Sequence, residues 1–222
     1  MIDVAGNLAR VRERLSRAAE RAGRTAEETL LVGVSKAIDV ERIRRAVAAG
    51  LPALGENRVQ EAKEKIGLIG RPVPWHFVGH LQTNKARDAV LLFDLIQSVD
   101  RLELARELHR RAEAAGKVAH VLVQVNLAGE ATKGGFGAEE LKGALEVLAE
   151  LSALSVRGLM TIPPPVEPPE LARGWFRRLR ELRDEAHLEH LSMGMSSDFE
   201  VAVEEGATIV RVGTAIFGPR TP

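Results

Sequence analysis

The chain has 222 residues, of which 45% are hydrophobic and 28% charged, a balance typical of a soluble protein with a substantial core. Its formal net charge is zero, which gives no general attraction to nucleic acid or to a membrane surface. Cysteine and tyrosine are both absent, which excludes disulfides, thiolate chemistry and a phenolic acid or base. No stretch has the length of a membrane span or the apolar core of a signal peptide, so we expect a cytoplasmic protein.

The first predicted element is an amphipathic helix over residues 4–22. Beyond it, short apolar and β-branched runs alternate with longer stretches whose apolar residues recur at helical spacing. Two of these helical stretches end in Gly50 and Gly116, a common way for a helix to stop. The predicted strands, in chain order, are residues 30–35, 52–55, 75–79, 94–99, 120–126, 156–162, 190–194 and 208–213.

Eight strands alternating with helices predict the α/β class with a parallel sheet, and eight strands are the number that closes a TIM barrel. The alternative is an open doubly wound sheet, which needs a glycine-rich turn after its first strand, and residues 33–40 supply none. We therefore predict a single (β/α)8 barrel domain over residues 1–222, with the extra N-terminal helix packed against its bottom or side. The proline-rich stretch 162–170 follows a strand and precedes a helix pattern, so it is predicted as a barrel loop.

Polar residues follow several strands, at the ends that share one face of a parallel barrel and carry its site. Lys36 follows the first strand, Glu56 and Asn57 follow the second, and His80 follows the third. Ordinary structural roles are open to all of them: a solvated lysine, a helix cap, and a hydrogen-bonding histidine. Metal binding is not expected, because His76 and His80 would not share a helix face and no carboxylate completes a ligand set.

The last two predicted strands are followed by small and hydroxylated residues, Ser196 and Ser197 after one and Gly213 and Thr214 after the other. Backbone N–H groups can approach an anion there, and the hydroxyls add donors. A helix that begins near Ser197 or Asp198 would point its positive end at the same place. Loops after strands seven and eight form the usual phosphate site of such barrels, so we favour phosphate binding over helix capping alone.

Arg211 is the charged residue in the apolar run 208–213. Burying a guanidinium is costly unless it has a fixed partner. Either a ligand or a salt bridge inside the barrel mouth could be that partner.

Six stretches carry a family resemblance: VGVSK (32–36), GENRVQE (55–61), WHFVGHLQTNK (75–85), QVNLAGEATKGGF (124–136), RGLMTIPP (157–164) and LSMGMSSDFEVAVEEGATIVRVGTAIFG (191–218). They cover nearly the whole chain in order, and the last is long and highly specific. Together they resemble the family of pyridoxal 5′-phosphate (PLP) homeostasis proteins, which is related to the barrel of alanine racemase. One difference from the family pattern is Arg58, where the family commonly carries tyrosine.

The resemblance implies a role for each candidate residue. Lys36 would hold PLP as a Schiff base, which requires the neutral amine that a sheltered lysine reaches more easily than one in water. The other residues implied in cofactor binding are Ser196, Gly213 and Thr214 at the phosphate, Ser197 as a further phosphate candidate, Arg211 facing the pyridine nitrogen, Asn57 near the ring, and His80 as a further pocket residue.

A permanent positive charge at Arg211 would oppose protonation of the ring nitrogen and make the ring a weaker electron sink. Racemisation also needs an acid or base on each face of the substrate; alanine racemase, by resemblance, uses a lysine and a tyrosine. Here tyrosine is absent, and the racemase's second domain is not expected after the eighth strand. We therefore predict a non-catalytic, monomeric PLP carrier in vitamin B6 homeostasis, which buffers PLP or delivers it to PLP-dependent apo-enzymes.

Two other functions stay open. A PLP-dependent amino-acid racemase would turn over an amino acid. A phosphate-binding barrel enzyme without PLP would use Lys36 as a general acid or base. An absorbance spectrum separates the second from the carrier, because only a PLP-loaded protein absorbs near the visible.

Overall fold

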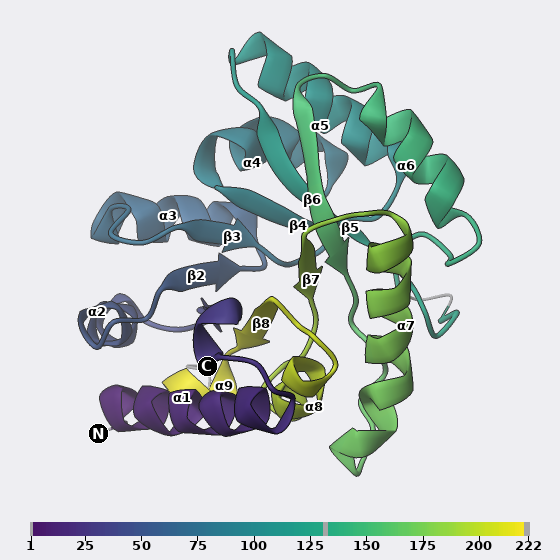
Figure 1. Ribbon diagram of the computed structural model, residues 1–222. Helices are drawn as coiled ribbons and strands as arrows, with labels where there is room; N and C mark the ends of the chain where they lie inside the picture. Colours follow the sequence, from purple (N-terminus) through teal and green to yellow (C-terminus); the bar gives the residue numbers. More distant parts are fainter. Residues whose placement is uncertain (1, 131–132, 220–222) are drawn as a thin grey trace.

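The computed structural model describes residues 2–130 and 133–219. Eight parallel strands pair in chain order, and the last pairs with the first, so the sheet closes into a barrel surrounded by helices (Figure 1). The predicted TIM barrel is therefore confirmed. The ends of the predicted domain, residues 1 and 220–222, and residues 131–132 of the motif 124–136 lie outside the described residues.

The strands are β1 (Leu30–Val34), β2 (Ala53–Glu56), β3 (Trp75–Phe77), β4 (Leu95–Val99), β5 (Ala119–Gln124), β6 (Leu154–Met160), β7 (His190–Ser192) and β8 (Ile209–Val212). The α-helices are α1 (Val4–Arg21), α2 (Val40–Ala48), α3 (Val59–Ile69), α4 (Ala86–Leu92), α5 (Leu102–Ala114), α6 (Leu141–Ala149), α7 (Arg173–Glu185), α8 (Phe199–Glu204) and α9 (Thr214–Phe217). Short 3-10 turns precede β1, α4 and α7. Within the described ranges, no helix is long and apolar enough to cross a membrane.

Most strands end one or two residues earlier than the sequence predicts, and after two of them other groups take over the hydrogen bonds. After β3, the Gly79 carbonyl accepts from the Ser98 hydroxyl at 2.5 Å. After β5, the loop residue Phe136 returns to the strand end, where its N–H donates to the Gln124 carbonyl at 2.9 Å. The backbone groups are thus satisfied by loops at the edge of the barrel where the site is expected.

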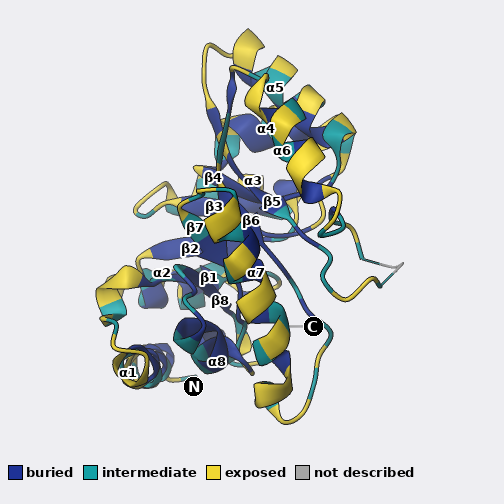
Figure 2. Cartoon of the chain, turned by 45° about the vertical axis from the view of Figure 1, so that its right-hand side comes forward, coloured by how far each residue is buried: buried dark blue, intermediate teal, exposed yellow. Residues whose placement is uncertain are grey.

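The apolar core has two parts. The larger part lies between the sheet and the helices, so the strands are buried while the outer faces of the helices are exposed (Figure 2). A smaller cluster inside the barrel comprises Val32, Ala53, Leu95, Leu122, Met160 and Ile209. Polar side chains share the buried interior with this cluster, among them His76, Gln97, Ser192 and Arg211. The inside of this barrel is therefore mixed in character, unlike its outer core.

Helix α1 packs against the side of the barrel, beside α8 and α9 (Figure 1). Its apolar face buries Leu8 and Leu15, among others, and the Asn7 amide donates to the Ile216 carbonyl of α9 at 2.9 Å. Helix α9 has four residues and is too short to cover β8 alone. The extra N-terminal helix, predicted from its amphipathic pattern, thus completes the outer layer next to the last strand.

We expect Leu8→Ala to lower the free energy of unfolding by about 2–5 kcal/mol, because it leaves a cavity under α1 where Leu8 is fully buried. Urea denaturation followed by circular dichroism measures this. Leu68→Ala is the matched control, since Leu68 is 62% exposed on α3, and it should change stability by less than about 0.5 kcal/mol. Equal losses in the two variants would show that α1 is not part of the cooperative fold.

Candidate functional site

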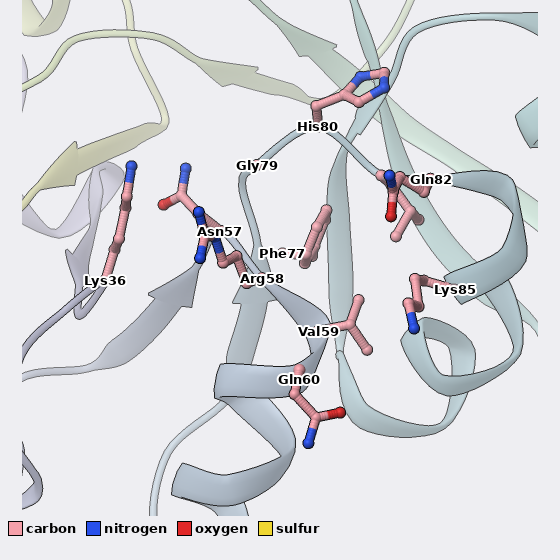
Figure 3. Close-up of a pocket in the computed structure, with 11 residues that line it drawn as sticks. Lys36, Asn57, Arg58, Val59, Gln60, Phe77, Gly79, His80, Gln82 and Lys85 are labelled. Carbon is pink, nitrogen blue, oxygen red and sulfur yellow. The ribbon is translucent and has the colours of Figure 1, made fainter.

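A cavity of about 460 Å³ opens at the carboxyl ends of β1, β2 and β3. Figure 3 shows its lining side chains, with Lys36 after β1, Asn57 and Arg58 after β2, and His80 after β3. A second cavity of about 380 Å³ shares Asn57 and His80 and extends toward Lys133. The structure thus brings three of the predicted site residues, Lys36, Asn57 and His80, to one cavity.

Glycine at position 79 allows the close approach of these strand ends. A Cβ atom there would lie 2.2 Å from the Asn57 carbonyl oxygen, a separation no side chain tolerates. The chain after β3 can therefore run against the chain after β2 only because residue 79 has no side chain. Asn57 and His80 consequently line the same two cavities.

The Lys36 amine is half-buried and is joined by no hydrogen bond or ion pair to any residue that the structure describes. Partial burial without a partner is unusual for a lysine, which normally pairs or extends into water. An unpaired amine at a cavity can act as a nucleophile toward a carbonyl group. This environment fits the lysine role that the sequence predicts.

A buried ion cluster next to Lys36 was not predicted from the sequence. The Lys65 amine of α3 donates to Glu56 Oε1 at 2.6 Å, to Glu61 Oε1 at 2.7 Å and to the Ser35 carbonyl at 2.6 Å. An ammonium has three protons, so every donor of Lys65 is used. Burial raises the pKa of Glu56, while the charge of Lys65 opposes that rise. The i, i+4 spacing of Glu61 and Lys65 on α3 was the available signal, but it is equally typical of an exposed helix pair.

The cluster holds the backbone on both sides of Lys36. The Ser35 hydroxyl donates to Glu56 Oε1 at 2.7 Å, and the Ala37 N–H donates to Glu61 Oε1 at 2.7 Å. Ala37 has φ of 55°, a left-handed conformation that is unfavourable for a residue with a Cβ. The carboxylate of Glu61 stabilises this kink, which turns the chain out of β1 directly after Lys36.

Hydrogen-bond donors gather where β7 and β8 end. The N–H groups of Gly213 and Ala215 point toward Ser196 Oγ, at 3.3 Å and 3.5 Å. A Cβ on Gly213 would come within 3.3 Å of the Val34 carbonyl, so this group of donors adjoins the end of β1 and Lys36. The hydrogen bonds from the two N–H groups to Ser196 Oγ are long and weak. The two N–H groups and the hydroxyl are therefore better suited to donate to a bound anion.

The other two predicted phosphate residues are placed less specifically. Ser197 and Thr214 are exposed, and the side-chain hydroxyl of neither is hydrogen-bonded to a residue that the structure describes. Helix α8 begins at Phe199 after Asp198, as the sequence predicts to within a residue. Asp198 Oδ1 accepts from the Met195 N–H at 2.6 Å, which shapes the turn that carries Ser196.

Arg211 lies inside the barrel with 4% of its surface exposed. Its guanidinium donates to Ser192 Oγ at 2.5 Å and to the Thr161 carbonyl at 2.9 Å. The salt bridge considered from the sequence is wrong: across residues 2–130 and 133–219, no carboxylate lies within ion-pair distance of Arg211. Burial lowers the pKa of Arg211 to about 10, opposed by Asp198, so the group remains a cation at neutral pH.

His80 contacts a carboxylate that directly follows the neighbouring strand β4. Its Nδ1 lies 2.9 Å from Asp100 Oδ2, and Asp100 Oδ1 accepts from Arg101 at 2.6 Å. The ring itself is largely exposed at the far side of the cavity from Lys36 (Figure 3). In the part of the chain that the structure describes, no cluster of three or more His, Asp or Glu side chains could hold a metal ion.

The family model of the alanine racemase N-terminal domain matches residues 6–221, nearly all of the chain. Alanine racemase from Clostridium difficile has the same fold, with a TM-score of 0.73 and 20% identity over 99% of this chain and 57% of the racemase chain. The barrel and its carboxyl-end site thus define a protein of the alanine racemase N-terminal domain class.

Two relatives place the chain more narrowly. The pyridoxal phosphate homeostasis protein of Aquifex aeolicus is 51% identical over 220 residues, covering 96% of each chain. The structure of PipY from Synechococcus elongatus with PLP bound superposes with a TM-score of 0.85 and 37% identity, covering 97% of this chain and all of PipY. The chain belongs to the family of pyridoxal phosphate homeostasis proteins.

We expect Lys65→Met to lower the free energy of unfolding by about 3–5 kcal/mol, because it leaves the buried Glu56 and partly buried Glu61 carboxylates without their cation. Lys63→Met on the same helix is the matched control. The Lys63 side chain is 60% exposed and its amine lies 4.0 Å from Asp88, so its removal should change stability by less than about 0.5 kcal/mol. Urea denaturation measures both, and a small loss in Lys65→Met would contradict a structural role for the cluster.

Proposed function

We propose that this chain binds PLP at the carboxyl end of its barrel, holds it covalently through Lys36, and serves in intracellular PLP homeostasis by buffering or delivering it. The observation that carries this proposal is the Lys36 amine, unpaired among the described residues, near the donors at Ser196, Gly213 and Ala215. In a member of this family, that pair of features matches the two ends of PLP, an aldehyde and a phosphate. The bound PLP of the relative PipY supports the same ligand.

The described residues fit PLP group by group. Lys36 supplies the amine for the aldehyde, and Ser196 with the N–H groups of Gly213 and Ala215 would hold the phosphate. Ser197 and Thr214, exposed at the rim of the same loops, add hydroxyls within reach of a phosphate there. Arg211 is a buried cation whose recorded partners are a hydroxyl and a carbonyl, which suits it to face an acceptor such as the pyridine nitrogen. Asn57 would lie beside the ring, and His80 would line the outer part of the pocket.

The site favours retention over turnover. Bound PLP supplies an electron-accepting ring, and its strength depends on protonation of the ring nitrogen. The positive charge of Arg211 disfavours that protonation. Racemisation would further require a second acid or base, and the chain has no tyrosine, while His80 is held by Asp100. We therefore favour a monomeric carrier that exchanges PLP with apo-enzymes over the racemase alternative.

Borohydride reduction of the PLP-loaded protein, followed by peptide mass spectrometry, should place a pyridoxyl group on Lys36. The Lys36 amine is paired with no residue that the structure describes, whereas the amines of Lys65 and Lys133 are held by carboxylates at 2.6 Å and 2.5 Å. Lys36→Ala should abolish this label. Lack of any near-visible absorbance on adding PLP would favour the barrel enzyme without PLP, and rapid exchange of the alanine α-hydrogen into deuterated water would favour the racemase.

Ser196→Ala should weaken binding of PLP by about 1.5–3 kcal/mol, roughly ten- to a hundredfold in affinity, because a hydrogen bond to a charged phosphate is lost. Binding of pyridoxal, which lacks the phosphate, should change little. Ser152→Ala is the control, since Ser152 is exposed just before β6, at the end of the barrel away from the site. Absorbance titration measures all four affinities, and equal weakening of PLP and pyridoxal would mean that Ser196 only shapes the loop.

A further inference from the structure

A chain of buried hydrogen bonds crosses the barrel interior behind Arg211. Arg211 donates to Ser192 Oγ at 2.5 Å, and Ser192 Oγ lies 2.6 Å from Gln97 Oε1. The Gln97 amide nitrogen lies 2.9 Å from Nδ1 of His76. These side chains come from β8, β7, β4 and β3, and all are buried. The chain therefore joins the carboxyl end of the barrel to its amino-terminal end.

The direction of each hydrogen bond follows from Arg211. A guanidinium can only donate, so Ser192 Oγ accepts from it. The Ser192 proton then points to Gln97, which must present its carbonyl oxygen. The remaining amide group of Gln97 donates, so Nδ1 of His76 must accept. The reversed amide orientation would leave the buried Ser192 proton without an acceptor among the residues described.

We propose that His76 and Gln97 are positioning residues, which act through Ser192 to hold the Arg211 guanidinium in place, and that His76 is kept as the neutral tautomer with its proton on Nε2. This tautomer is the one that leaves Nδ1 free to accept. Its consequence for PLP rests on the proposed function, because Arg211 is expected to face the pyridine nitrogen. The arrangement of the four side chains does not depend on any ligand.

The surroundings of His76 favour the neutral ring. Burial lowers the pKa of His76 to about 4, with Asp94 opposing that shift and His190 adding to it. The ring also lines a cavity of about 370 Å³ at the amino-terminal end of the barrel, together with His120, Arg157 and His190. A cationic ring would place an N–H of His76 against the Gln97 amide protons, and the hydrogen bond between His76 and Gln97 would be lost.

The tautomer can be measured directly on the ¹⁵N-labelled protein without added PLP, through two-bond ¹H–¹⁵N correlations of the histidine rings. We expect His76 to carry its proton on Nε2, with Nδ1 unprotonated, by at least about fivefold over the other tautomer, since the other tautomer leaves a buried donor unsatisfied. A native His76 with its proton on Nδ1 would overturn the proposal, and this measurement needs no variant that might fail to fold.

Gln97→Glu should reverse the tautomer, because a carboxylate offers His76 only acceptors and draws a proton onto Nδ1. The matched control is Gln124→Glu on β5. The Gln124 amide donates a hydrogen bond to the Gly134 carbonyl and takes no part in the hydrogen bonds between Arg211 and His76. It should leave the His76 signals as in the native protein. An unchanged tautomer in Gln97→Glu would contradict the proposed hydrogen-bond direction.

Positioning of Arg211 is tested separately by its guanidinium signals. In the native protein the Arg211 N–H protons should give resolved resonances, because Ser192 and Thr161 restrict rotation. Gln97→Leu frees the Ser192 hydroxyl and should broaden or merge them, whereas Gln124→Leu should not. If His76 has the expected tautomer but Gln97→Leu leaves the Arg211 resonances unchanged, the proposed positioning role of His76 and Gln97 is wrong. Since no arm uses PLP, failure here is distinguishable from failure of the proposed function, which PLP titration tests.

Discussion

The pairing of β1 with both β2 and β8 is the constraint on which the site depends. Gly33 lies opposite Leu54 on one side and Val212 on the other. Three residues further along each strand, this register sets Lys36 between Asn57 and Ala215. Parallel strands share one carboxyl end, so closure of the barrel brings Asn57 and Ala215, about 160 positions apart in the sequence, to the two flanks of one lysine. An open sheet would leave β1 and β8 at opposite edges.

Two nearby lysines then take opposite roles because their surroundings differ. Lys65 donates its three protons to two carboxylates and a carbonyl, and these hydrogen bonds restrain the backbone around Lys36. Among the residues that the structure describes, Lys36 has no hydrogen-bond or ion-pair partner, and it lines the cavity. A flexible lysine loses conformational freedom when it reacts. Here the neighbouring groups have already ordered the backbone that carries Lys36, so less freedom remains to be lost. The stability of the ion cluster and the availability of the Lys36 amine are two results of the same packing.

The sequence predicted the elements and the residues at strand ends well, because apolar runs, helix-stop glycines and strand-following polar residues are local signals. It could not predict the partners. Lys65 has the spacing of an ordinary surface lysine on α3, and only the tertiary packing of α3 against β2 shows that it is buried. The contact between Gln97 and Ser192 spans 95 positions and joins strands from different halves of the chain. The salt bridge weighed for Arg211 failed for the same reason, since a sequence shows that a buried cation needs acceptors but not which ones.

The partners of Arg211 explain why the barrel interior is polar along one line. A carboxylate beside Arg211 would satisfy it and would also cancel its charge toward the barrel mouth. Ser192 satisfies it without cancelling the charge, but a hydroxyl that accepts must also donate, and its acceptor Gln97 has amide protons of its own. Ser192 and Gln97 each accept one hydrogen bond and donate another, so each requires a further acceptor deeper in the barrel. This series of hydrogen bonds ends at an uncharged group that only accepts from its neighbour. The neutral imidazole of His76 is such a group, because its Nδ1 accepts from Gln97. The length of this buried chain is therefore a consequence of keeping the Arg211 charge uncompensated.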